Sequence, residues 1–225
     1  MGEVKLSKVY DAKNSDKQVF IIKQFHSPPK EVLSTCSPEV KDQLIKVIAN
    51  HQKDIFRYLD KEKTNALFVE GVYQDTDFKR FKLSFGVGQK GSADAKIMKV
   101  SRDDFKAIPD SFWAAFGGGI VYAAVLMLSV KKSDNLELVL AANNLKDKPT
   151  EYALKVKERE IAVLKDVEAY MGANNLASAC VVFGGGHDFA SIAQSINYTF
   201  DIIEVVVESY PENTKVGTLL KQCKK

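Results

Sequence analysis

The sequence predicts an α/β protein with a mainly parallel central sheet that is covered by helices on both faces. Short apolar runs alternate with longer amphipathic segments, and the apolar runs are continuous rather than alternating with polar residues. Continuous apolar strands are typical of parallel sheets that are buried on both sides. The 225 residues, 45% of them hydrophobic, suffice for one domain. Residues 1–225 are interpreted as a single α/β domain, because no linker or low-complexity run divides them.

The first part of the chain is interpreted as a βαβ unit. A strand is expected over residues 18–25 (QVFIIKQF), and Ser37 and Pro38 mark the start of an amphipathic helix of about six turns. A second short strand, NALFV, ends at Glu70. This order predicts a right-handed crossover between parallel strands. Residues 74–111 have no clear pattern and are expected to carry short elements that shape the pocket.

The middle of the chain contains nineteen uncharged residues, 112–130, which would be long enough to span a bilayer. Three consecutive glycines within this segment favour a buried core helix that begins after them, so no membrane span is expected. Further strands are predicted over 136–142 (LELVLAA), 177–183 (ASACVVF) and 201–208 (DIIEVVVE). Helices are predicted over 150–170 and 187–196.

The composition excludes several classes of protein. The net charge is only +3, and Lys and Arg are interleaved with Asp and Glu, which argues against nucleic-acid binding. The cysteines, Cys36, Cys180 and Cys223, are odd in number and share no short spacing. A disulfide framework is therefore not expected, whereas a reducing compartment is. Because the N-terminal residues have no apolar run typical of a signal peptide, a cytoplasmic location is expected.

Two of the three histidines stand in matching places. His26 follows the apolar core of one strand after three intervening residues, and His187 follows Phe183 in the same way. Glu70 comes directly after NALFV. Ligands of open α/β sheets bind outside the carboxyl ends of the strands. The sequence therefore predicts two imidazoles and a carboxylate at one rim, although a single histidine or glutamate there is more often a plain loop or capping residue.

The glycines Gly184, Gly185 and Gly186 before His187 allow a ligand to approach the backbone closely. His187 is expected at a helix N-terminus, where the helix dipole would keep its ring neutral and able to act as a base or a metal ligand. His51 falls on the apolar face of its helix and is expected in the core, as is Cys180 within its strand. The nucleophile elbow of α/β serine hydrolases is excluded, since the chain has no GxSxG motif.

In their order and spacing, these motifs resemble those of the erythromycin esterase, ChaN-like and TraB (Tiki) superfamily. The matching stretches are KQFH with His26, NHQKDIF, LFVEG with Glu70, KERE with Arg159 and Glu160, and VVFGGGHDF with His187. The first departs from the family pattern, because Lys23 stands where the family has glycine. The resemblance implies two related α/β halves and a site formed by His26, Glu70, Arg159 and His187.

Members of that superfamily differ in activity, so the resemblance leaves several functions open. The leading hypothesis is a hydrolase of an ester or amide bond in a small molecule or peptide. Glu70 and one histidine would deprotonate water, and Arg159 would stabilise the oxyanion. In a metal-dependent form, His26, Glu70 and His187 would hold a divalent ion.

Two alternatives remain open at this point. One is a non-enzymatic protein that binds haem or a metal ion, for which Tyr73 is the candidate ligand beside the site. The other is a degenerate site that serves as an interaction module. The lysine at position 23 supports this second alternative, and a fully occluded rim would favour it.

Overall fold

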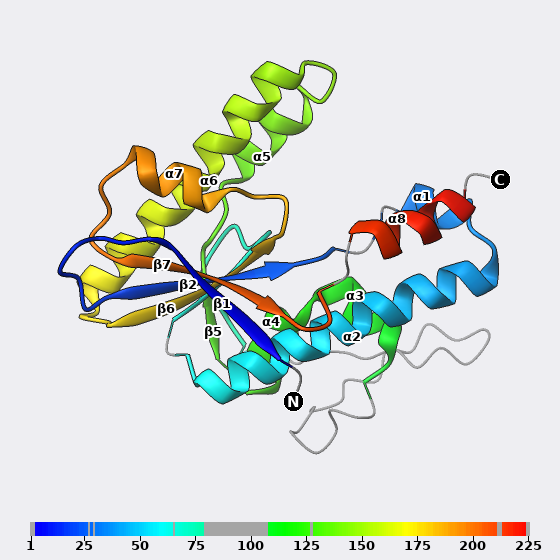
Figure 1. Cartoon of the computed structure of the whole chain (residues 1–225), viewed down its shortest axis with the longest axis horizontal. Helices are drawn as coiled ribbons and strands as arrows, with labels where there is room; N and C mark the ends of the chain where they lie inside the picture. Colours follow the sequence, from blue (N-terminus) through cyan, green and yellow to red (C-terminus); the bar gives the residue numbers. More distant parts are fainter. Residues whose placement is uncertain are drawn as a thin grey trace.

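The computed structural model describes residues 3–26, 28, 30–64, 66–78, 108–126, 128–210 and 213–223. The described residues form seven strands and eight helices (Figure 1). The strands are β1 (Val4–Tyr10), β2 (Gln18–Gln24), β3 (Leu67–Val69), β4 (Thr76–Asp77), β5 (Ser129–Lys131), β6 (Ser178–Gly184) and β7 (Asp201–Val207). The helices are α1 (Lys30–Ser34), α2 (Pro38–Glu62), α3 (Asp110–Phe116), α4 (Gly118–Val125), α5 (Leu136–Asn143), α6 (Pro149–Ala173), α7 (Phe189–Ser195) and α8 (Asn213–Gln222).

All seven strands belong to one sheet, in the order β1-β7-β2-β6-β3-β5-β4. The five inner strands are parallel to their neighbours, whereas the edge strands β1 and β4 pair antiparallel with β7 and β5. The predicted α/β class and the mainly parallel sheet are therefore confirmed.

A hydrophobic core lies on each face of the sheet. Helices α2, α3 and α4 pack over one face and α6 and α7 over the other (Figure 1). Neighbouring residues of β2 show the division, because Ile22 belongs to the first core and Ile21 to the second. Each central strand must be apolar on both sides, which explains the continuous apolar runs in the sequence.

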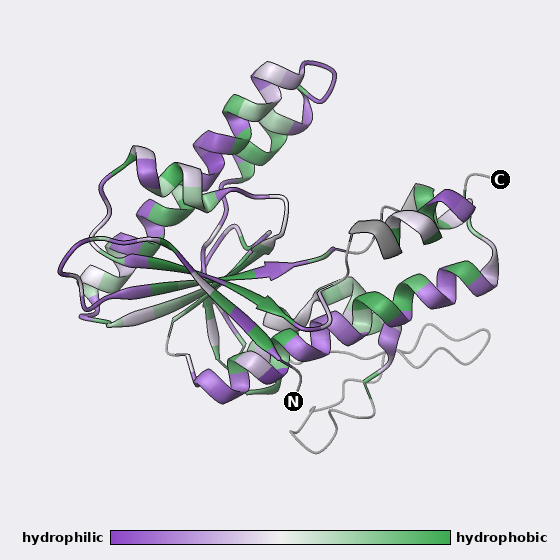
Figure 2. Cartoon of the chain, viewed as in Figure 1, coloured by the Kyte–Doolittle hydropathy of each residue, from purple (hydrophilic) through white to green (hydrophobic). Residues whose placement is uncertain are grey.

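Helix α2 forms as its sequence predicts. The Ser37 side chain accepts a hydrogen bond from the Val40 N–H at the N-terminus, and Pro38 occupies the first helical position. Lys63 ends the helix in the left-handed conformation. Polar and apolar residues alternate along α2 (Figure 2), and its buried residues pack against α8 near the start and in the core over the sheet farther along.

Of two predictions for the middle of the chain, the strand is wrong and the buried helix is confirmed in outline. Residues 136–142 form helix α5 rather than a strand, because the Asn135 side chain accepts hydrogen bonds from the Glu137 and Leu138 N–H groups and starts a helix. The sequence also predicts a buried helix that begins after the three glycines, and helix α4 is found there, although it begins at Gly118, within the triplet, and ends at Val125. Gly117, at φ +78°, separates α3 from α4, and the uncharged segment 112–130 ends in strand β5. Within the described ranges, no helix is both long and apolar enough to cross a membrane.

The two ends of the described chain contain structure that the sequence did not predict. Residues 4–10 add strand β1 to the edge of the sheet, and helix α8 packs against α2. A disulfide joins Cys36 to Cys223, so the expectation that all cysteines are free is wrong for this pair. The two cysteines are 187 residues apart in sequence and meet only because α8 returns to the start of α2. Cys180 is free and buried in β6, as expected.

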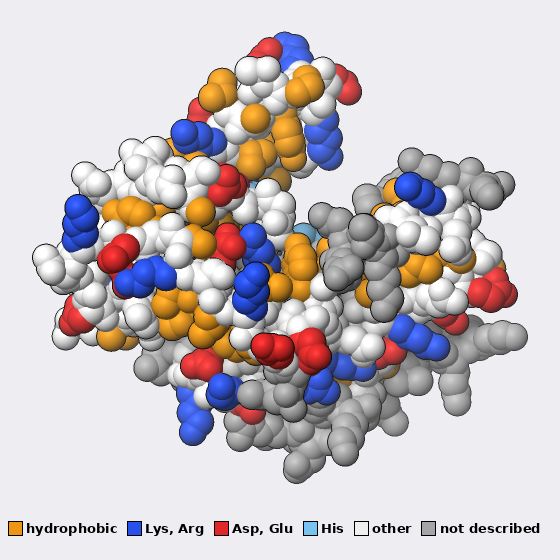
Figure 3. Space-filling model, viewed as in Figure 1, with side chains coloured by type: hydrophobic (Ala, Val, Ile, Leu, Met, Phe, Trp, Pro, Cys, Tyr) orange, Lys and Arg blue, Asp and Glu red, His pale blue; other side chains and the backbone are white. Residues whose placement is uncertain are grey.

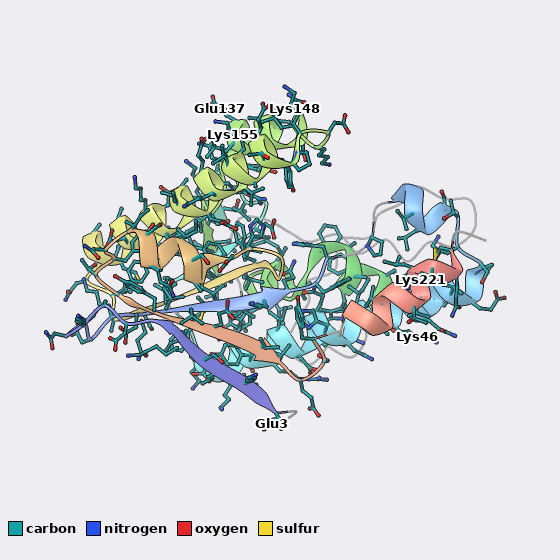
Figure 4. All side chains as sticks on the ribbon, turned by 45° about the horizontal axis from the view of Figure 1, so that its top comes forward. Glu3, Lys46, Glu137, Lys148, Lys155 and Lys221 are labelled. Carbon is teal, nitrogen blue, oxygen red and sulfur yellow. A yellow bond between two sulfur atoms is a disulfide. The ribbon has the colours of Figure 1, made fainter. Side chains whose placement is uncertain are left out.

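The α5–α6 hairpin projects from one side of the sheet, and α1, α8 and the start of α2 lie on the other side (Figure 1). Charged side chains such as Glu137, Lys148 and Lys155 mark the outer part of this hairpin, and Lys46 and Lys221 mark the opposite side (Figure 4). The carboxyl edge of the sheet lies between these two parts. Of the unassigned residues 74–111, positions 79–107 lie outside the described residues.

Candidate functional site

The predicted site residues meet at the carboxyl ends of adjacent strands. Strand β6 lies between β2 and β3, and β5 is the next strand beyond β3. Parallel pairing continues past the strand ends, since the Gly185 N–H donates to the Gln24 carbonyl at 2.8 Å. On the other side of β6, the Glu70 N–H donates to the Val182 carbonyl at 2.9 Å. His26, Glu70 and His187 are thereby brought to one rim, as predicted.

Glu70 is the centre of the site. Its Oε2 lies 2.6 Å from His26 Nε2 and accepts a second hydrogen bond, also of 2.6 Å, from the Gly184 N–H. Its Oε1 accepts from Arg159 Nη2 at 2.8 Å and lies 3.4 Å from His187 Nε2. Burial alone would raise the pKa of Glu70. The hydrogen bonds of His187 and His26 outweigh that effect and hold the pKa far below its ordinary value, so the carboxylate is ionised.

Arg159 connects Glu70 to a residue that the sequence did not identify, Asp134. Its Nε and Nη2 bind the two oxygens of Asp134 at 2.7 and 2.5 Å. The Asp134 side chain is fully buried and also accepts from the Gly71 N–H. Burial opposes the charge on Arg159, but the hydrogen bonds and charges of Asp134 and Glu70 raise its pKa further above its ordinary value.

Asp134 was missed for a structural reason. It lies three residues past the carboxyl end of β5, at the same edge of the sheet as Glu70, which follows β3 directly. The sequence was interpreted with a strand at 136–142 and none at 129–131, which placed Asp134 before a strand instead of after one. The signal that could have identified it is the polar run of Ser133, Asp134 and Asn135 after an apolar segment.

His187 carries a charge that its position in the sequence did not predict. Its Nδ1 lies 2.9 Å from the buried Glu160 Oε1, which also accepts from the Asp188 N–H. Burial lowers the pKa of His187, but Glu160 and Glu70 outweigh burial and raise the pKa to about 9. The expectation of a neutral ring is therefore wrong. Two carboxylates determine its charge, and helix α7 begins only at Phe189.

His26 has different surroundings. Its side chain is 50% exposed, whereas that of His187 is 12% exposed. The amide nitrogen of Gln24 lies 3.1 Å from His26 Nδ1. An amide nitrogen only donates, so Nδ1 accepts and Nε2 carries the proton that is given to Glu70. The remaining lone pair of the ring therefore lies on Nδ1.

The second glycine of the triplet allows a close contact. A Cβ atom on Gly185 would lie 1.8 Å from the hydroxyl of Tyr210, so no larger residue fits while Tyr210 keeps its place. Gly184 lies against Glu70 and His26, and Gly186 has open space around it. The first two glycines therefore have close neighbours that belong to the protein itself, and the close approach of a ligand stays a prediction.

A cavity of about 480 Å³ opens at this rim. Besides His26, Glu70, His187 and the three glycines, its lining includes Phe25, Tyr152, Val156 and Tyr210. The surface is hollowed between the α5–α6 hairpin and the part of the molecule that carries α8 (Figure 3). The rim is open, so the occlusion that would favour a degenerate site is not observed.

Two further sequence-based expectations concern residues beside the site. Lys23 is turned away from the cavity lining and pairs with Glu204 of β7 at 3.1 Å. The change from glycine thus leaves the rim open. Tyr73, the candidate haem ligand, is exposed but does not line the cavity, whereas Tyr152 and Tyr210 do.

Comparison of the chain with known protein families, with characterised proteins and with solved structures found no match.

Proposed function

We propose that the protein is a hydrolase that cleaves an ester or amide bond by activating water at the His26–Glu70 pair. The observation that carries this proposal is the position of His26. Its half-exposed imidazole lines the cavity, and a buried, ionised carboxylate holds its Nε2 at 2.6 Å. A histidine oriented by a carboxylate is the usual general base of hydrolytic sites. The resemblance to the erythromycin esterase superfamily points to the same class.

In this proposal, His26 Nδ1 takes the proton from water. A water molecule that displaces the Gln24 amide would reach this lone pair from the cavity. As the water oxygen attacks the carbonyl carbon, the proton moves to Nδ1, and the ionised Glu70 stabilises the imidazolium. The same proton then passes to the leaving alkoxide or amine when the tetrahedral intermediate breaks down. Protons and charges therefore balance without another reactant.

His187 is the better candidate for stabilising the oxyanion. Its ring is protonated at neutral pH, and Nδ1 is committed to Glu160. Its Nε2–H lies 3.4 Å from Glu70, a long contact that leaves this proton available to a substrate oxygen in the cavity. We therefore assign to His187 the role that the sequence suggested for Arg159.

Arg159 is instead a positioning residue. Its guanidinium binds Asp134 and Glu70, its side chain is 14% exposed, and it does not line the cavity. A bidentate pair of this kind fixes the orientation of the arginine. Arg159 therefore holds the Glu70 carboxylate toward His26.

A divalent metal ion at this site would be held by His26, Glu70 and His187. Both oxygens of Glu70 already accept from protein donors, namely His26, the Gly184 N–H and Arg159. Among the described residues, no group of three or more His, Cys, Asp or Glu side chains is arranged as a metal site. The arrangement does not fit a metal ion, and the proposed steps use none. Metal content of the purified protein, measured by plasma mass spectrometry, tests this part directly.

The test of the proposal is hydrolysis of a panel of chromogenic esters and anilides by the wild type and three variants. His26→Ala and Glu70→Gln are expected to lower kcat at least 100-fold, since a positioned general base contributes roughly 10²–10⁴. Glu204→Gln is the matched control, because Glu204 is another half-buried, ion-paired carboxylate of the same sheet but lies outside the cavity. This control is expected to keep wild-type kcat.

Two results would contradict the proposal. One is hydrolysis that persists undiminished in His26→Ala or Glu70→Gln. The other is a His187→Ala variant that retains full kcat, because an oxyanion donor is expected to contribute about 10²–10³ in kcat.

A further inference from the structure

His51 is a buried polar residue that the proposed hydrolysis does not use. It lies on α2, is 0% exposed and has Tyr210 edge-to-face against it, with ring centroids 5.3 Å apart. Its Nε2 accepts a hydrogen bond of 3.1 Å from the Phe25 N–H, directly before His26. A buried polar ring without a structural or chemical role would be costly to retain, so its contacts call for an explanation.

The neighbouring Gln52 binds the backbone carbonyl of the same residue, Phe25. Gln52 Nε2 donates to the Phe25 carbonyl at 2.8 Å, and Gln52 Oε1 accepts from the Gly118 N–H at 2.7 Å. Both backbone groups of Phe25 are thus bound by consecutive side chains of one helix. Residue 25 lies beyond the end of β2, where ladder hydrogen bonds no longer fix the chain.

His51 also reaches the opposite wall of the cavity. Tyr210, which packs on the His51 ring, places its hydroxyl over Gly185, the residue that follows β6. One buried imidazole therefore contacts both the segment that carries His26 and the tyrosine that lies over the glycine loop. A displacement of His51 would move two sides of the cavity.

We propose that His51 is a positioning residue, which, together with Gln52, fixes the Phe25 backbone so that His26 meets Glu70. Burial lowers the pKa of His51 to about 4, which keeps the ring neutral and its Nε2 able to accept. The positioning of Phe25 and His26 by His51 does not depend on hydrolase activity, whereas the effect of His51 on catalysis rests on the proposed function.

The three histidines make a direct test possible, because a protein labelled at histidine ¹³Cε1 gives three side-chain crosspeaks in an NMR spectrum. His26→Gln and His187→Gln assign them. The decisive pair is His51→Gln and His51→Asn. A glutamine amide oxygen reaches the place of Nε2 and can still accept from Phe25, whereas an asparagine amide reaches only the place of Nδ1.

We expect the His26 crosspeak to keep its wild-type position in His51→Gln and to move in His51→Asn. Leu59→Ala is the control, since it removes a fully buried side chain from the same helix without touching Phe25. Its His26 crosspeak is expected to stay in place. A His26 crosspeak that is unchanged in folded His51→Asn, or that moves equally in Leu59→Ala, would overturn the proposal.

A second measurement needs no variant, so it remains decisive if His51→Asn does not fold. Amide exchange of Phe25 in the wild type is expected to be slow, because its N–H is bound to a buried acceptor. Exchange as fast as that of an open loop would also overturn the proposal. Where hydrolysis is measurable, His51→Asn should lower kcat roughly 10- to 100-fold with little change in KM. Absence of any hydrolysis would contradict the proposed function and leave the NMR test of His51 intact.

Discussion

The two histidines of the site occupy matching positions in the sequence, yet the two parts of the site hold them differently. On the β2–α2–β3 side, His26 is half exposed and contacts one carboxylate and a neutral amide. On the β5–α6–β6 side, His187 is nearly buried between Glu160 and Glu70, next to the Arg159–Asp134 pair. The first arrangement leaves a lone pair on Nδ1 that only a neutral amide contacts, whereas the second keeps a proton. Similar positions at strand ends therefore give opposite chemical roles, which surrounding charges decide.

The comparison predicts that stability depends mainly on the β5–α6–β6 side. Arg159→Met leaves the buried Asp134 without its cation and Glu70 with one fewer donor, so the free energy of unfolding should fall by about 3–5 kcal/mol. Urea unfolding measures this difference. Arg57→Met is the control, because Arg57 pairs with Asp54 at the surface, where loss of a pair costs less than about 1 kcal/mol. Equal effects of the two changes would show that the Arg159 cluster is not a buried network.

The charge on His187 predicts a dependence of stability on pH. Its pKa is about 9 in the folded protein against 6.5 unfolded, so the folded state binds the proton more tightly. The resulting stabilisation, roughly 3 kcal/mol, is complete below pH 6.5 and is lost as the pH rises to about 9. Unfolding of the wild type and His187→Gln from pH 6 to 9.5 should show their difference shrinking with pH. A difference that grows with pH would contradict the assigned charge.

His51 predicts the opposite dependence of stability on pH within the same protein. Its pKa of about 4 in the folded state lies below 6.5, so the stability it contributes is present above pH 6.5 and is lost toward pH 4. His51→Gln should reduce the loss of unfolding free energy toward acid pH and leave the loss between pH 6.5 and 9 unchanged. This serves as the internal control for the His187 titration.

A smaller effect is expected where the two parts of the site meet. A Cβ atom on Gly184 would lie 3.0 Å from Glu70 Oε2 and 3.2 Å from His26 Nε2, so Gly184→Ala must displace one of them. A loss of about 1–3 kcal/mol is expected from this crowding. Gly186→Ala, with open space around it, should stay within about 0.5 kcal/mol of the wild type. Thermal unfolding of both variants compares the two positions, and equal shifts would argue against the observed contact.

The smallest effect on stability is expected for His26, which matters for chemistry instead. His26→Gln should change the free energy of unfolding by less than about 1 kcal/mol, because the side chain is half exposed and glutamine can still donate to Glu70. Hydrolysis should nevertheless be lost. A large loss of stability would show that His26 is part of the buried network and would remove the contrast with His187.

Much of the fold follows from local patterns in the sequence. The cap at Ser37 with the period of α2, and the apolar runs of β2, β3, β6 and β7, each specify their element within a short stretch of chain. Short apolar segments are ambiguous, and LELVLAA formed a helix because Asn135 caps it. Strand β1 (VKLSKVY) has no continuous apolar run and forms by pairing with β7, a partner far along the chain.

The candidate site was likewise predictable from the sequence only in part. His26, Glu70 and His187 could be placed together from sequence because the carboxyl ends of parallel strands share one edge, whereas Arg159, on α6, was indicated only by the resemblance. Their states of charge could not be predicted, since the pKa of His187 depends on Glu160 and Glu70, which approach it only in the folded chain. The same holds for Asp134 at Arg159, for Tyr210 over Gly185 and for the bond between Cys36 and Cys223. Periodicity and capping act between near neighbours in the sequence, whereas ion pairing and burial depend on distances that exist only once the sheet is assembled.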